Sequence, residues 1–344
     1  MRLALFSSYS PFVHGGGRFI VEWLDQKLQE YGHQVESIYL PFSDHPRDLL
    51  SQMMAFRAVN IEDVDRVICF RPPSHLLRHP NKVLWFIHHF RAFYDLWNSE
   101  WGPPHTRYYG ALRRAVFRAD GIAFKEARAI FANSRTVQAR LKTFNNIDSR
   151  VLYPPLLDPT IYANAGYGEE VVYISRLVPH KRQHLLVEAV AHAKTTVKAR
   201  ICGVDNPGGT YAEELLGLAS RLGVSDRVSI ENRWSSEQEK RDIIGRSLAV
   251  AYFPLDEDSY GYSSLEGAHS CKPLLTTTDS GGVLEFVVHE RNGLVCDPDA
   301  KSIAESLDRL YTDRKLVQDL GNEANKTVEE LRIDWDNVID HLLA

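Results

Sequence analysis

The chain has few cysteines, and none of them is spaced as in a zinc site. Its 344 residues include Cys69, Cys202, Cys271 and Cys296, with no Cys-x-x-Cys pair among them. Disulfide frameworks and structural zinc sites both depend on paired or closely spaced cysteines. The sequence therefore predicts neither, and it favours a reducing, cytoplasmic environment.

Long apolar runs are also missing. No stretch approaches the roughly 18 apolar residues that a membrane-spanning helix needs. The N-terminal residues MRLALFSSYSPF contain a short apolar run, but the residues after this run are mainly Ser, Pro, His and Gly. This is neither the apolar core nor the cleavage site of a signal peptide, so we expect no exported or membrane-spanning protein.

An excess of charge of one sign is absent as well. The net charge is −5, from 40 basic and 45 acidic residues that are interspersed along the chain. Nucleic-acid-binding and strongly basic membrane proteins usually show a large local or global cationic excess. The balance predicts no nucleic-acid partner, and any charged ligand must be recognised locally.

The sequence does have enough apolar residues, 44%, for two domains with cores of their own. Short apolar runs alternate with segments of helical period, which is typical of β-α units that form a mostly parallel sheet. The expected strands lie near residues 3–7, 35–40, 67–70, 83–88, 130–132, 171–175, 199–204, 228–231, 248–253 and 273–277.

The alternation lapses once, in the segment YPPLLDPTIYANAGYG at residues 153–168. Adjacent prolines, Asn and Gly suppress regular structure, so this segment predicts a domain boundary. We expect Rossmann-like domains over residues 1–165 and 166–328, followed by a helix over residues 329–344 that packs back toward the first domain. The predicted fold class is α/β, with a deep ligand cleft that both domains face at the carboxyl ends of their strands.

Two motifs point to phosphate binding. Gly15, Gly16 and Gly17 lie between the first expected strand and helix, where missing Cβ atoms let backbone N–H groups approach a phosphate. Arg176 and Lys181 follow the first strand of the second domain and could neutralise a diphosphate leaving group. A flexible turn and a solvated loop are the respective structural alternatives.

The most informative motif is DEDSYGYSSLEGA at residues 256–268. Its glycine permits a tight turn into a helix, and the first N–H groups of that helix, at Tyr262, Ser263 and Ser264, would point at a ligand. Asp258 and Glu266 could accept hydrogen bonds from the hydroxyls of a sugar and a ribose. Alternatively, Asp258 only caps the helix.

Asp256 and Asp258 also form an Asp-x-Asp pair, which binds a divalent metal in another class of sugar transferase. We favour the metal-free interpretation, because a glycine turn and a helix N-terminus can already neutralise phosphate.

In the first domain, an apolar strand ends at His88 and His89. One of these imidazoles could donate a hydrogen bond to a sugar or hold a charge near the reacting centre, and the other could be structural.

In this order, these segments resemble the retaining GT-B glycosyltransferases of the family-4 type (glycosyl transferases group 1) over nearly the whole chain. The resemblance also includes Phe131-Ala132-Asn133-Ser134, Gly281-Gly282-Val283-Leu284-Glu285 and Trp335. The first domain would then be on the acceptor side, and the second would bind a nucleotide sugar. The family motif has two glutamates with seven residues between them; here the spacing is kept, but the first acid is Asp258.

The resemblance implies a role for each of these residues. Glu266 would bind the ribose, Asp258 and His88 would lie at the donor sugar, and Arg176 and Lys181 would bind the diphosphate. The loop Gly15–Gly17 would lie beside the phosphate and acceptor.

The implied reaction is metal-independent hexosyl transfer with retention of configuration, as in polysaccharide biosynthesis. It needs no cofactor beyond the substrate, a GDP-, UDP- or dTDP-linked sugar. The acceptor would be a glycan, a lipid-linked molecule or a small molecule. A non-hydrolysing nucleotide-sugar epimerase and a non-catalytic sugar-binding protein are the alternatives.

One further segment, residues 105–118, bears on the acceptor. It carries Arg107, Arg113, Arg114 and Arg118 without an acid, interleaved with aromatic residues. Such a pattern suits anionic headgroups, and thus peripheral contact at the inner face of the membrane, but also a solvated helix face or an anionic acceptor.

Overall fold

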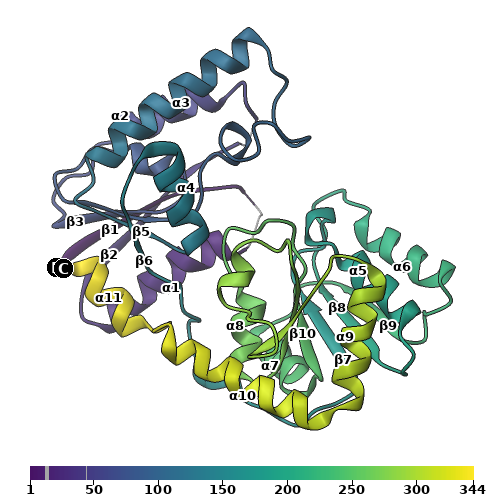
Figure 1. Ribbon diagram of the computed structural model, residues 1–344. Helices are drawn as coiled ribbons and strands as arrows, with labels where there is room; N and C mark the ends of the chain where they lie inside the picture. Colours follow the sequence, from purple (N-terminus) through teal and green to yellow (C-terminus); the bar gives the residue numbers. More distant parts are fainter. Residues whose placement is uncertain (12–14, 44) are drawn as a thin grey trace. The chain divides into compact units, whose positions relative to one another are not determined.

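A computed structural model describes residues 1–11, 15–43 and 45–344 (Figure 1). The chain divides into two compact units. Unit 1 consists of Met1–Leu157 and Asp334–Ala344, and unit 2 of Asp158–Ile333. The division therefore falls before the boundary expected after residue 165, because the irregular segment at residues 158–168 belongs to unit 2 throughout.

Unit 1 contains a six-stranded, entirely parallel sheet of order β2-β1-β3-β4-β5-β6. Its strands are β1 (Arg2–Tyr9), β2 (Gln34–Pro41), β3 (Arg66–Cys69), β4 (Lys82–Phe86), β5 (Ala129–Ala132) and β6 (Arg150–Val151). Its helices are α1 (Gly16–Glu30), α2 (Leu49–Ala58), α3 (Arg107–Lys125), α4 (Arg135–Asn145) and α11 (Trp335–Leu343), with 3-10 turns η1 (Ser74–Leu76) and η2 (Arg91–Phe93).

Helices cover both faces of this sheet. On one face, α1 and α11 share a core cluster that includes Leu24, Trp335 and Leu342. On the other face, α2, α3 and α4 bury side chains such as Phe56 and Phe124 against the strands. Buried apolar residues on both sides of the sheet explain the continuous apolar strands in the sequence.

Unit 2 contains a second six-stranded parallel sheet, of order β12-β11-β10-β7-β8-β9. Its strands are β7 (Glu170–Ile174), β8 (Lys198–Gly203), β9 (Val228–Asn232), β10 (Ala249–Ala251), β11 (Leu274–Thr277) and β12 (Gly293–Cys296). Its helices are α5 (Gln183–His192), α6 (Tyr211–Arg221), α7 (Glu237–Arg246), α8 (Tyr262–His269), α9 (Ala300–Thr312) and α10 (Arg314–Glu330), with 3-10 turns η3 (Pro159–Ile161), η4 (Pro179–Lys181) and η5 (Gly282–Glu285).

Each sheet has a point where the strand order reverses. In unit 1 the order reverses between β1 and β3, and in unit 2 between β7 and β10. The loops that leave such neighbouring strands run to opposite faces, so a crevice opens at the carboxyl ends of the two strands. Ligands of doubly wound α/β sheets bind there, and the expected site residues can be tested against these two positions.

The predicted α/β class with two Rossmann-like sheets is confirmed, and ten of the strands lie where the sequence places them. The sequence does not reveal β6, which has only two residues, or β12, which begins at a glycine. Within the described ranges, no helix is long and apolar enough to cross a membrane.

Candidate functional site

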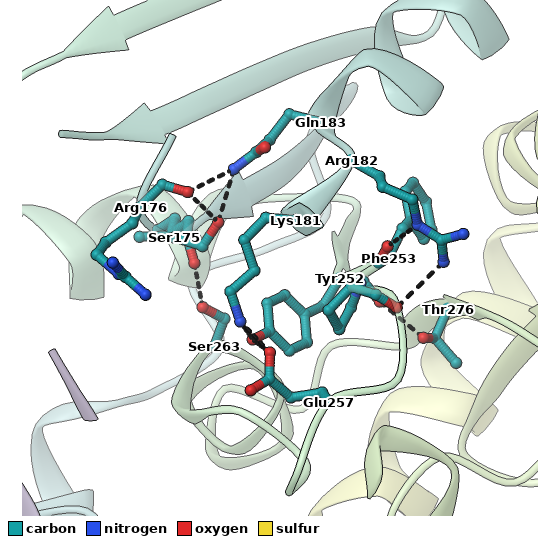
Figure 2. A network of polar contacts seen from close by, with 12 residues as sticks. Ser175, Arg176, Lys181, Arg182, Gln183, Tyr252, Phe253, Glu257, Ser263 and Thr276 are labelled. Carbon is teal, nitrogen blue, oxygen red and sulfur yellow. Dashed lines mark hydrogen bonds and ion pairs between the residues drawn. The ribbon is translucent and has the colours of Figure 1, made fainter. Parts of the chain in front are cut away.

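Lys181 lies in η4, after the carboxyl end of β7, and is only 8% exposed. Its Nζ donates a hydrogen bond of 2.6 Å to the Tyr252 hydroxyl and forms an ion pair with Glu257 (Figure 2). A buried ammonium group is costly unless it is paired and hydrogen-bonded. These two partners therefore fix the position of the Lys181 charge at the switch point between β7 and β10.

Glu257 follows β10 and completes this ion pair. Burial by itself would raise the pKa of its carboxyl group, but the Lys181 charge and the hydrogen bonds from Lys181 and Tyr252 outweigh burial and lower the pKa to about 2. Glu257 is therefore ionised at neutral pH. The sequence drew attention to Asp256 and Asp258 on either side, and Glu257 was missed although it lies within the same acidic loop.

Arg176 occupies the turn that connects β7 to η4, and its side chain is exposed. Buried Gln183 fixes this turn, because its Nε2 donates 2.8 Å bonds to the Arg176 carbonyl and to the Ser175 hydroxyl (Figure 2). The guanidinium group itself forms no hydrogen bond or ion pair with any residue that the structure describes. The backbone of Arg176 is thus held in place, while its guanidinium group remains a solvent-accessible cation close to Lys181.

The helix α8 begins at the same switch point. Its N-cap, Gly261, has φ +73°, and a Cβ atom there would lie 2.4 Å from the Tyr252 ring, so only glycine fits this turn. The Ser263 hydroxyl donates to the Ile174 carbonyl and ties the first helical turn to the end of β7. Ser263 and Ser264 are buried, and the N–H of Ser264 already donates to the Gly261 carbonyl.

Glu266 lies one turn into α8 and is 2% exposed. Its Oε1 is 2.6 Å from the Nζ of Lys240 in α7, which also pairs with Glu237 at 2.7 Å. Lys240 therefore balances the charge of Glu266 and fixes one carboxylate oxygen. The sequence carries no local signal for this pair, whose members are 26 residues apart.

The acidic loop that contains Asp258 packs against the glycines that follow β11. The N–H of Gly282 donates a 2.7 Å bond to the Glu257 carbonyl, and the N–H of Asp256 donates a 3.0 Å bond to the Asp279 carbonyl. At Gly281, with φ +62°, a Cβ atom would lie 2.6 Å from the Glu257 backbone. The close approach of two loops thus explains these glycines, and it places half-buried Asp258 between Glu257 and α8.

Arg182 joins three strand-end loops of unit 2. Its guanidinium forms two 2.7 Å bonds to the Asp279 carboxylate, after β11, and its Nε donates a 2.7 Å bond to the Phe253 carbonyl, after β10. The residue itself follows η4 in a left-handed conformation, with φ +55°. We call the Arg182–Asp279 pair the loop clamp. Neither residue belongs to a motif from which the pair could be predicted.

In unit 1, the switch point between β1 and β3 brings Gly17 near Arg71. A Cβ atom on Gly17 would lie 3.1 Å from the Arg71 side chain. The expectation that Gly15–Gly17 form a loop before the helix is wrong in part. Helical hydrogen bonds already run from the N–H groups of Arg18 and Phe19 to the Gly15 carbonyl, so Gly15 is the N-cap and the other two glycines lie in α1.

The two histidines that follow β4 have different environments, and the strand itself ends at Phe86 rather than His88. His89 is 1% exposed and its Nε2 lies 2.9 Å from the Asn145 Oδ1. His88 is only half-buried, and its Nδ1 donates a 2.8 Å bond to the His89 carbonyl. His88 is therefore the accessible imidazole and His89 the structural one.

Burial, followed by the nearby Arg71 charge, lowers the pKa of His88 to about 3. This low pKa favours the neutral ring at pH 7, and therefore a hydrogen-bonding role for His88 over a charged one. Because a carbonyl oxygen only accepts, Nδ1 carries the proton and Nε2 offers a lone pair. His88 can accept a hydrogen bond from a hydroxyl through Nε2.

The structure brings Arg176, Lys181, Asp258, Ser263 and Glu266 together at the carboxyl edge of the sheet in unit 2. Gly17 and His88 lie at the corresponding edge of unit 1. Across residues 1–11, 15–43 and 45–344, no group of three or more His, Cys, Asp or Glu side chains is placed to hold a metal ion. The arrangement in unit 2 offers cations, a helix N-terminus and buried carboxylates, which together can bind a phosphorylated, hydroxyl-rich ligand.

Comparisons with known proteins agree with a site for a phosphorylated, hydroxyl-rich ligand. Residues 162–327 match the family model described as glycosyl transferases group 1. Over 226 residues the chain is 28% identical to a GDP-mannose-dependent alpha-(1-6)-phosphatidylinositol monomannoside mannosyltransferase of Mycolicibacterium smegmatis, with 61% of this chain and 58% of the relative covered. It is 24% identical to the human alpha-1,3/1,6-mannosyltransferase ALG2, with 78% and 70% covered. The chain spans about half the length of the mycobacterial relatives, 58% and 46%.

Solved structures show the same fold at low sequence identity. HepE from Anabaena in complex with UDP has a TM-score of 0.72 and 16% identity, covering 100% of this chain and 98% of that one. Sucrose-phosphate synthase from Thermosynechococcus elongatus has a TM-score of 0.77 and 16% identity, covering 99% and 97%. The chain therefore has the α/β fold of the GT-B glycosyltransferases. Most of its second unit, residues 162–327, matches the model of the glycosyl transferases group 1 family.

Proposed function

We propose that the chain is a retaining, metal-independent glycosyltransferase that transfers a hexosyl unit from a nucleotide diphosphate sugar. The observation that carries this proposal is the convergence of Lys181, Arg176 and the N-terminus of α8 at the β7–β10 switch point. Two cations and a helix N-terminus are the groups that neutralise a diphosphate without a metal. The similarity to known glycosyltransferases gives no support to the epimerase alternative.

In this proposal each end of the donor has its own carboxylate. Glu266, held by Lys240, accepts hydrogen bonds from the ribose hydroxyls through its remaining oxygen. Asp258 contacts the donor sugar directly or through water, because its side chain is one methylene shorter than the usual Glu. His88 accepts a hydrogen bond from a sugar hydroxyl through Nε2.

The proposed chemistry uses the leaving group as the base. The acceptor hydroxyl attacks the anomeric carbon from the face that the diphosphate leaves, the C1–O bond to the phosphate breaks, and a phosphate oxygen takes the acceptor proton. No protein nucleophile is needed. Arg176 and Lys181 stabilise the charge that grows on the departing diphosphate, which lowers the barrier if these contacts strengthen in the transition state.

The nucleotide is GDP, UDP or dTDP in this proposal. One relative uses GDP-mannose by its name, and one similar structure contains UDP. The acceptor is a glycan, a lipid-linked molecule or a small molecule. For a lipid-linked acceptor, the reaction takes place at the cytoplasmic face of a membrane.

Mass-spectrometric product detection tests the proposal. The protein is incubated with GDP-, UDP- and dTDP-linked hexoses and a pool of glycan and lipid acceptors, with and without EDTA. We expect one donor to give a hexosylated acceptor plus free nucleotide diphosphate in both conditions, with the anomeric configuration of the donor retained by NMR. An altered nucleotide sugar formed without any acceptor would instead identify an epimerase, and loss of activity in EDTA would contradict metal independence.

A further inference from the structure

A row of unpaired cations follows one side of α3 in unit 1. It consists of Arg107, Arg114, Arg118 and Lys125, and we call it the α3 basic row. All four side chains are exposed. At about 100° per residue, these positions lie within roughly 20° of one line along the helix, and the row is about 27 Å long. The sequence spacing therefore builds a straight, one-sided cationic ridge.

Nothing in the described chain neutralises this row. None of its four side chains forms a hydrogen bond or an ion pair with any residue of the described ranges, 1–11, 15–43 and 45–344. The one acid within α3, Asp120, is 1% exposed and is bound by His75 at 2.8 Å and by the Tyr94 hydroxyl at 2.7 Å. Glu126, just after the helix, is paired with Arg57 at 2.6 Å.

The opposite side of α3 explains why the helix holds this orientation. Leu112, Val116 and Ala123 are buried in a core cluster with α2, and Phe124 is buried in the cluster below the sheet. The amphipathic packing leaves the helix no freedom to turn its cations inward. The ridge is thus a permanent feature of the surface of unit 1.

Exposed apolar side chains flank the row. Tyr108 is 54% exposed and Ile122 is 48% exposed, one near each end of α3. A straight line of cations with an aromatic and an aliphatic side chain beside it matches a flat anionic surface, where headgroups pair with the cations and the apolar groups reach the interface. In a chain of net charge −5, this row concentrates positive charge along one exposed side of α3.

We propose that the α3 basic row docks unit 1 onto the surface of an anionic lipid bilayer. This inference concerns a surface outside the candidate site of unit 2 and does not depend on the proposed glycosyl transfer. The partner is an anionic headgroup layer rather than a nucleic acid, because the row is straight and exposed apolar groups flank it.

Vesicle sedimentation with the full chain tests this docking. The probes are vesicles of phosphatidylcholine alone and with about 30% phosphatidylglycerol, at low and high NaCl. Each basic residue near an anionic surface contributes about fivefold to binding, so replacing all four by Gln should weaken binding to the anionic vesicles about a hundredfold or more. Binding of the wild-type protein should also weaken as salt rises.

The matched control removes the same charge from exposed positions of unit 2, by replacing Lys194, Arg221, Lys301 and Lys315 with Gln. We expect this control to bind the anionic vesicles like the wild-type protein. Affinity for UDP or GDP, measured by calorimetry, should not change in the row variant, which separates docking from the donor site. If the quadruple row variant does not fold, the pair Arg114→Gln and Arg118→Gln should still lose more than tenfold.

Several results would overturn the inference. These are equal binding to neutral and anionic vesicles, undiminished binding by the row variant, and an equal loss in the control. Binding of the wild-type protein to poly-uridine but not to vesicles would assign the row to a nucleic acid instead.

Discussion

Lys181 and Glu257 show how single side chains define the candidate site. The lysine has its ammonium group fixed by the Tyr252 hydroxyl at 2.6 Å and by the Glu257 carboxylate. Any diphosphate that binds Lys181 must approach this carboxylate, and the side chain of Glu257 is still 24% exposed. Glu257 therefore opposes diphosphate binding while it keeps Lys181 in place.

Replacing Glu257 with Gln should strengthen the binding of nucleotide diphosphates. The amide keeps the shape and a hydrogen-bonding oxygen but removes a negative charge a few ångströms from the phosphates, which should raise affinity about tenfold. Calorimetry with UDP and GDP measures the effect, and Glu257→Asp, which keeps the charge, is the control. A lower affinity in Glu257→Gln would show that the carboxylate itself contacts the donor.

His89 should make the stability of the protein depend on pH. Burial lowers the pKa of His89 to about 4. If Nδ1 gained a proton, no described residue is placed to accept a hydrogen bond from it. Between this value and about 6.5, the unfolded chain binds more protons, so stability rises with pH across this window and is lost as pH falls. The loss attributable to His89 is roughly 3 kcal/mol from pH 6.5 to 4.

Denaturant titrations across this range, for the wild-type protein and His89→Gln, check the assignment. The variant should show a shallower decline in the free energy of unfolding as pH falls. Parallel pH profiles for the two proteins would refute the role of His89.

At the scale of elements, the loop clamp sets the positions of the loops around the candidate site. Arg182 and Asp279 link η4 to the loop after β11, and the Phe253 carbonyl adds the loop after β10. Asp279→Asn should destabilise unit 2 by about 1–2 kcal/mol, since the pair is bidentate but partly exposed. Differential scanning calorimetry measures this loss.

Arg182→Gly separates the clamp from the backbone. Glycine adopts the left-handed conformation of residue 182 without strain, so this substitution relieves backbone strain. It also removes the hydrogen bonds of the Arg182 side chain. A net loss of stability and weaker diphosphate binding would support the clamp. Unchanged values in both variants would mean that the three loops hold their positions without it.

The elements most readily predicted from the sequence are those with strong local signals. Buried parallel strands such as β7 and β11 appear as short apolar runs, and the turn at Gly261 follows from its glycine. The Arg176, Lys181 and Asp258 segments were placed correctly on loops after strands. Their partners were not, because Lys240 and Asp279 approach the site through tertiary contacts that no local pattern records.

At the scale of the whole molecule, the C-terminal helix α11 belongs to unit 1, although unit 2 lies between the two segments in the sequence. Trp335 is 8% exposed, donates a 2.8 Å bond to the Leu156 carbonyl and packs edge-on against Trp85. An apolar helix at the end of the chain can be read from the sequence. The sequence also predicts that this helix packs back toward the first domain, but the side chains that Trp335 contacts in the core of unit 1 follow only from the fold.

Trp335→Ala should therefore destabilise unit 1 by about 3–5 kcal/mol, the usual cost of removing a buried Trp side chain. Nucleotide diphosphate binding by unit 2 should persist at temperatures where unit 1 stays folded. Thermal unfolding with Trp101→Ala as the control, whose side chain is 55% exposed, checks both points. A loss in Trp335→Ala no larger than in the control would mean that α11 contributes little to this core.

The central claim is that a nucleotide diphosphate binds at the β7–β10 switch point, with its ribose on Glu266. Calorimetry of UDP, GDP and dTDP with the wild-type protein and Glu266→Gln tests it without knowledge of the acceptor. Exposed Glu305 supplies the control variant, Glu305→Gln. We predict that one nucleotide binds the wild-type and control proteins equally and binds Glu266→Gln about tenfold to a hundredfold more weakly, the scale of hydrogen bonds to a charged group. The same affinity in all three proteins, or no binding of any nucleotide diphosphate, would contradict the claim.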